Sequence, residues 1–73
     1  MKMTIVELNR VFTIERNGRK GKYKIINHPF FDNVFALVRE HQLIHMQTKT
    51  DEKYIIAGSP TIEKAYEAAY YAT

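Results

Sequence analysis

The segment VFTIERNGRKGKYKI (residues 11–25) determines how this chain begins to fold. In its centre Asn17-Gly18 separates two runs in which apolar and polar residues alternate. Alternation with a period of two is typical of β-strands, and an Asn-Gly pair suits a two-residue turn because both of its positions need positive φ. The segment therefore predicts a β-hairpin with its turn at residues 17 and 18.

The turn position also predicts the register of the hairpin, because cross-strand partners can be counted outward from residues 17 and 18. One face pairs Ile14 with Gly21, Phe12 with Tyr23 and Arg10 with Ile25, whereas the other pairs Glu15 with Lys20, Thr13 with Lys22 and Val11 with Lys24. The first face is mostly apolar and the second is strongly basic. We expect the apolar face to be partly covered by helices and the basic face to be open to a partner.

Residues 4–8, before the hairpin, are rich in β-formers, and we expect one long strand with a bend near Asn9. Two roles are open for this segment. Its edge could accept an added peptide strand or a docked helix from a partner. Alternatively, it pairs with residues 54–56 inside the sheet.

After the hairpin, His28-Pro29 ends the second strand, because proline lacks a ladder donor. Asp32 or Asn33 can cap a helix that ends near residues 40–41. Its apolar residues recur at three- and four-residue spacing, and they are Val34, Phe35, Leu37 and Val38. The pattern predicts a short middle helix.

Two further apolar runs, residues 43–46 and 54–56, flank the polar segment 48–53. This arrangement favours a second hairpin. A helix that continues to Met46 is the competing interpretation of the first run.

The last element is a helix that starts after Gly58, with Ser59 as its N-cap and Pro60 in its first turn. An i, i+3, i+4, i+7 stripe that should pack on the sheet consists of Ile62, Ala65, Tyr66 and Ala69. The chain as a whole predicts one α+β domain over residues 1–73 with the order ββαββα. Its small antiparallel sheet, an N-terminal hairpin plus a second hairpin, would pack against a short middle helix and the C-terminal helix.

Composition narrows the class of protein further. The 73 residues include no cysteine, which excludes disulfides and thiolate chemistry and fits a reducing cytoplasm. The first ten residues lack the apolar core of a secretory signal, and no stretch reaches the length of a membrane span. The formal net charge is +3, with an excess of positive charge before residue 31 and of negative charge after it. This asymmetry predicts an acidic partner surface, either protein or nucleic acid.

The sequence offers no evident catalytic set, so we expect a chain that is not an enzyme and needs no cofactor. Ser59, the only serine, is accounted for as a helix cap. His41 and His45 stand at metal-ligand spacing if the segment is helical, and His28 would be needed as a third ligand. A minimal enzyme or metal protein built on these three histidines is one alternative class.

The basic hairpin and the strand before it are the predicted partner-binding region. The candidate residues are Val6, Leu8, Arg10, Phe12, Arg16, Arg19, Lys20, Lys22 and Tyr23. Lysines interleaved with an aromatic residue resemble a nucleic-acid surface, but in this register Tyr23 points away from the lysines. Protein docking by a monomer is therefore the leading interpretation. A small DNA-binding module that uses the 10–25 hairpin in a groove is the alternative.

The whole chain, from MKMTIV (residues 1–6) to YYAT (residues 70–73), resembles the small transcription regulators of lytic Xanthomonas bacteriophages. The resemblance implies a protein that binds the N-terminal region of the β′ subunit of the host RNA polymerase. It further implies inhibition of transcription initiation through weaker σ binding, together with antitermination, in the cytoplasm of the host bacterium. No residue role is transferred from these regulators.

Overall fold

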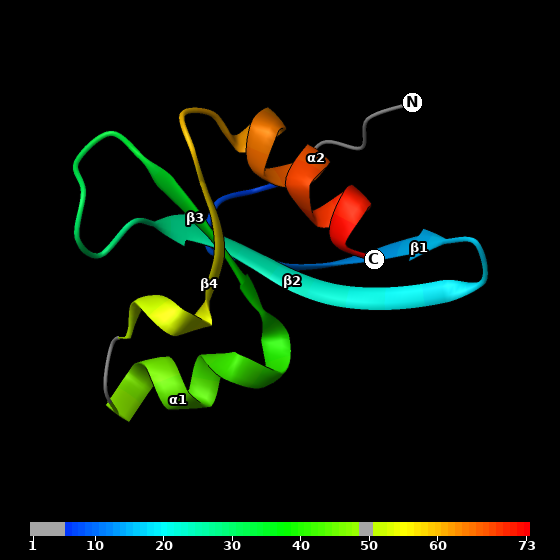
Figure 1. The fold of residues 1–73 in the computed structure, drawn as a ribbon, viewed down its shortest axis with the longest axis horizontal. Helices are drawn as coiled ribbons and strands as arrows, with labels where there is room; N and C mark the ends of the chain where they lie inside the picture. Colours follow the sequence, from blue (N-terminus) through cyan, green and yellow to red (C-terminus); the bar gives the residue numbers. More distant parts are fainter. Residues whose placement is uncertain (1–5, 49–50) are drawn as a thin grey trace.

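The computed structural model describes residues 6–48 and 51–73 and shows an α+β fold, as the sequence predicts (Figure 1). An antiparallel sheet of four strands has the order β1-β2-β3-β4. The strands are β1 (Val11–Arg16), β2 (Arg19–Asn27), β3 (Phe35–Arg39) and β4 (Ile55–Ser59). The helices are α1 (Leu43–Thr48) and α2 (Ile62–Ala72), with two 3-10 turns, η1 (Glu40–Gln42) and η2 (Glu52–Tyr54).

The β1–β2 hairpin has the predicted register, with Phe12 opposite Tyr23 and Ile14 opposite Gly21. Asn17 and Gly18 form the turn with φ of 52° and 77°. Both values lie in the left-handed region that a two-residue hairpin turn requires. The local sequence is therefore sufficient to specify this element.

The expected bend before the hairpin is also present. Asn9 has a φ of 66°, and its N–H donates to the carbonyl oxygen of Ile25 at 2.8 Å. The prediction of one long strand is wrong, however, because β1 begins only at Val11 and residues 6–8 belong to no strand. Pairing of this segment with residues 54–56 is wrong for residues 6–8, since β4 pairs with β3; residues 4 and 5 lie outside the described range.

A short middle helix is present as α1, but its predicted position is wrong, because most of the predicted segment is the central strand β3. β3 pairs with both β2 and β4, and Ala36, Leu37 and Val38 have no exposed surface. A strand buried on both faces needs a continuous apolar run, and such a run also contains residues at helical spacing. Asn33 has a φ of 60° in the preceding turn and caps no helix.

The predicted strand at residues 43–46 is also wrong, because these residues lie in α1. The competing interpretation, a helix that reaches Met46, is correct for this stretch, although the helix starts at Leu43 rather than near residue 34. The second hairpin is replaced by a longer connection through η1, α1 and η2 between β3 and β4. α1 lies near the end of β3 and the start of β4, away from α2 (Figure 1).

α2 covers one face of the sheet with the predicted stripe, in which Ala65, Tyr66 and Ala69 are buried (Figure 1). The core on this face unites them with Ile14, Tyr23, Ile25 and Leu37. The predicted cap is two residues too early. Thr61 is the N-cap, and its hydroxyl accepts from the Lys64 N–H at 3.1 Å, whereas Ser59 ends β4.

Candidate docking surface on the β1–β2 hairpin

Three lysines project from the face of β2 that α2 does not cover. Lys20, Lys22 and Lys24 alternate along the strand with core residues such as Tyr23 and Ile25. Successive side chains of a strand point to opposite faces, so burial of the core residues turns the lysines outward. Lys20 and Lys22 are exposed and Lys24 is half-buried. We call these three residues the cationic face.

The positive charge of the cationic face is not neutralised within the described residues. Among the described residues, ion pairs join Arg10 to Glu7 and Lys53 to Asp51, and neither pair involves a residue of the cationic face. Glu15 is the cross-strand partner of Lys20, yet the two form no ion pair. The cationic face therefore carries three charges that an acidic partner can approach.

An apolar residue and an open strand edge lie beside the cationic face. Val11 is opposite Lys24 and is 47% exposed. β1 is at the end of the strand order, so no described strand pairs with its outer edge. Unpaired edges are places where another chain can add by main-chain hydrogen bonds. The positive charges, an exposed apolar side chain and an unpaired strand edge therefore lie next to one another.

The segment before β1 is arranged differently from the prediction of an open docking strand. Val6 and Leu8 are partly buried and pack against the core. Arg10 is exposed, and its Nε donates to a Glu7 carboxylate oxygen at 2.8 Å. Val6 and Leu8 therefore stabilise the fold in this structure rather than form part of an open edge.

Two further candidates, Phe12 and Tyr23, belong to an aromatic cluster under α2. The Phe12 ring centroid lies 6.0 Å from that of Tyr23 and 5.7 Å from that of Tyr66. Tyr23 is only 1% exposed, and its hydroxyl forms a hydrogen bond of 2.8 Å with the Thr73 hydroxyl. These two residues shape the hairpin but offer a partner little surface.

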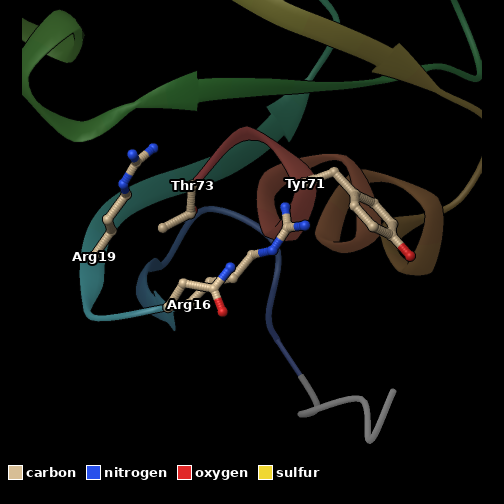
Figure 2. A pocket seen from close by; sticks show the side chains of 5 residues that line it. Arg16, Arg19, Tyr71 and Thr73 are labelled. Carbon is tan, nitrogen blue, oxygen red and sulfur yellow. The ribbon is translucent and has the colours of Figure 1, made fainter.

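Arg16 and Arg19 flank the turn and lie on the side of the hairpin toward α2, so they are separate from the cationic face. Together with Asn17 they line an open pocket of about 380 Å³ whose other wall is Tyr71 and Thr73 (Figure 2). Sequence reasoning missed this pocket. Tyr71 lies outside the predicted apolar stripe of α2 and is 62% exposed, and nothing in the sequence indicates that it approaches the hairpin turn.

The histidines do not form a common site in the described structure. His28 lies in the loop before β3, His41 in η1 and His45 in α1, where its ring stacks on Tyr54 at 5.4 Å. Within residues 6–48 and 51–73, no three histidine or carboxylate side chains are grouped so as to hold a metal ion. Among the same residues, no helix is both long enough and apolar enough to cross a membrane.

Comparison of the chain with protein-family models, with curated proteins and with solved structures gave no match.

Proposed function

We propose that this chain is a non-enzymatic regulator that binds a protein partner through the cationic face and the adjoining edge of β1. The observation that carries the proposal is the outward row of Lys20, Lys22 and Lys24 without ion pairs in the described structure. A stable fold does not require like charges at alternate positions of one strand. Such a row is typical of a surface that attracts an acidic partner.

The lysines, Val11 and the β1 edge are expected to contribute differently to binding, because they expose different chemical groups. Fully exposed lysines steer a partner during approach but add little to the lifetime of a complex, because water screens them. Val11, exposed and next to the lysines, supplies apolar area that is buried on contact. The open edge of β1 offers main-chain donors and acceptors to the same partner.

The resemblance to small regulators of lytic Xanthomonas bacteriophages gives the partner. We take it to be bacterial RNA polymerase, bound at the N-terminal region of its β′ subunit by a monomer of this chain. Binding there would weaken the hold of the σ factor, inhibit initiation at host promoters and promote read-through of terminators. The protein would act in the cytoplasm of the host bacterium.

A binding experiment with Xanthomonas RNA polymerase holoenzyme tests the proposal. Lys20→Glu with Lys22→Glu reverses two charges of the cationic face, and Lys53→Glu with Lys64→Glu reverses two exposed charges elsewhere. We expect the first pair to weaken binding to immobilised polymerase by about tenfold or more and the second pair by about twofold or less. Equal effects would show that only net charge matters and would reject the cationic face as the docking surface.

A transcription assay tests the consequence of binding. The chain should reduce σ-dependent initiation at a host promoter and raise read-through of an intrinsic terminator, and the cationic-face variant should lose both effects. Duplex DNA alone provides the comparison. Lysine-dependent binding to DNA with steep salt dependence, and no binding to polymerase, would favour the DNA-binding module instead.

A further inference from the structure

The pocket at the hairpin turn places the cross-strand partners Arg16 and Arg19 beside the end of α2, which is far from the turn in the sequence. Its lining residues are Arg16, Asn17, Arg19, Tyr71 and Thr73. Figure 2 shows the Arg16 and Arg19 side chains on either side of Thr73, with the Arg16 guanidinium beside the ring of Tyr71. The pocket volume of about 380 Å³ accommodates a group as large as an amino-acid side chain.

Arg16 is held in place by α2 before any ligand arrives. Its Nη1 donates to the carbonyl oxygen of Tyr70 at 3.3 Å. Its guanidinium carbon lies 4.9 Å from the Tyr70 ring centroid and 5.1 Å from that of Tyr71. A guanidinium has five N–H donors, and this fixed position leaves most of them for another acceptor. Little side-chain freedom remains to be lost when that acceptor binds.

Arg19, unlike Arg16, is not held in place by contacts with α2. Its side chain is exposed and forms no hydrogen bond, ion pair or ring contact within the described part of the chain. The described structure contains no carboxylate within ion-pair distance of either arginine. Two positive side chains therefore line the pocket, and no side-chain carboxylate among residues 6–48 and 51–73 forms an ion pair with either of them.

We infer that this pocket binds a carboxylate. The planar fork of a guanidinium matches a carboxylate through two parallel hydrogen bonds, and Arg16 presents that fork from a fixed position. The Asn17 amide lines the same pocket and can donate to a second oxygen, whereas the Thr73 hydroxyl already donates its proton to the carbonyl oxygen of Ala69. Tyr71, 62% exposed, offers apolar contact to the carbon stem of the ligand.

The carboxylate comes from a protein, either from an acidic side chain or from the end of a chain, and this assignment of the source rests on the proposed function. The pocket adds a second contact on the α2 side of the hairpin, distinct from the cationic face. Steering by the lysines acts over distance, whereas the pocket recognises one planar anion at short range. The pocket therefore supplies specificity that a row of exposed lysines lacks.

NMR titration of the isolated chain tests the site with four probes. They are acetyl-Gly-Glu-Gly-amide, acetyl-Gly-Gly-Gly with a free carboxylate, the neutral acetyl-Gly-Gln-Gly-amide and inorganic phosphate. We expect saturable shifts of the Nε–Hε signals of Arg16 and Arg19 with at least one of the first two, and a comparison between them identifies the source of the carboxylate. Equal binding of the Gln peptide, or saturation by phosphate but by neither carboxylate peptide, would overturn the inference.

Two matched variants separate recognition from general charge. Arg19→Gln should weaken peptide binding by about fivefold or more, whereas Lys64→Gln, which removes the same charge from an exposed position outside the pocket and the cationic face, should change it by less than about twofold. Arg16→Lys keeps the charge but removes the fork, so it should also weaken binding. Equal losses in Arg19→Gln and Lys64→Gln would reject a defined site. The peptide titration contains no polymerase, so it tests the pocket independently of the proposed function. If the chain binds the carboxylate peptide but does not bind polymerase, the inference about the pocket stands and the proposed function is rejected.

Discussion

The ring of Tyr23 fills the space beside Gly21 in which a side chain would otherwise lie. A β-carbon at residue 21 would fall 2.7 Å from both Cε2 and the hydroxyl oxygen of Tyr23. The ring cannot easily move, because it is buried and its hydroxyl is hydrogen-bonded to Thr73. Gly21 is therefore required by the packing of its own strand rather than by its backbone conformation.

Gly21→Ala is expected to lower the free energy of unfolding by about 1–3 kcal/mol, because overpacking shifts a buried ring. Urea denaturation followed by circular dichroism measures the loss. Gly58→Ala is the control, since a β-carbon there would lie 3.4 Å from its nearest neighbour, a Val34 methyl carbon, which is ordinary contact. An equal loss in both variants would mean that the Tyr23 ring does not restrict residue 21.

Gly18→Val tests the turn through backbone strain alone. A β-carbon at residue 18 meets nothing within 4 Å, but φ is +77°, which β-branched residues resist. We expect a loss of about 1–3 kcal/mol, seen as a lower midpoint in thermal melts. Gly18→Asn should lose less, because asparagine tolerates positive φ. An unchanged midpoint for the valine variant would contradict the turn at residues 17 and 18.

The hairpin was predictable because its determinants are local. The turn residues and the alternation of Phe12, Ile14 and Tyr23 lie within one short segment, and the predicted register agrees with the structure. The cationic face follows from the same alternation, so it could be found from the sequence. Here local pattern and final structure agree, which is typical of a two-residue hairpin.

The central strand was not predictable by the same means. Val34, Phe35, Leu37 and Val38 fit a helical stripe and a buried strand equally well. The strand forms because β2 and β4 provide hydrogen-bond partners on both sides, and β4 is distant in the sequence. The pocket escaped prediction for the same reason: Arg16 meets Tyr70 across 54 positions of sequence.

Thr61→Ala tests the corrected start of α2. The Thr61 hydroxyl accepts the Lys64 N–H at 3.1 Å, so its removal leaves a helix N–H without its cap. We expect the free energy of unfolding to fall by about 1 kcal/mol in chemical denaturation. Ser59→Ala should cost less, because Ser59 lies in β4 and caps no helix. A larger loss in Ser59→Ala than in Thr61→Ala would indicate that Ser59, and not Thr61, is the N-cap of α2.

Leu8→Asp tests whether the segment before β1 supports the fold. Leu8 is partly buried against the core, and a charge there would lose hydration without gaining a partner. A loss of about 1–3 kcal/mol is expected in thermal or urea unfolding. Glu7→Gln, at the exposed neighbouring position, should change stability by less than about 0.5 kcal/mol. Full stability of Leu8→Asp would restore residues 6–8 as an available docking segment.

The last prediction is that the exposed charges mainly set the association rate with the partner, whereas the apolar contact mainly sets the dissociation rate. Charges on exposed side chains mainly accelerate association and are screened over a Debye length of about 8 Å at physiological salt. Buried apolar contacts mainly set the dissociation rate. Lys20→Glu with Lys22→Glu should therefore slow association with polymerase by about tenfold at low salt and reduce its salt dependence, with about a twofold change in dissociation.

Val11→Asp should have the opposite signature. Val11 is 47% exposed at the start of β1, so the aspartate can remain hydrated in the free chain and the fold should persist, which an NMR spectrum checks. Loss of the apolar contact should shorten the complex's lifetime by an amount that corresponds to about 1–3 kcal/mol. Surface plasmon resonance at three salt concentrations resolves both rates. If folded Val11→Asp dissociates at the wild-type rate while the lysine variant abolishes all binding, β1 is not part of the contact and recognition depends on charge alone.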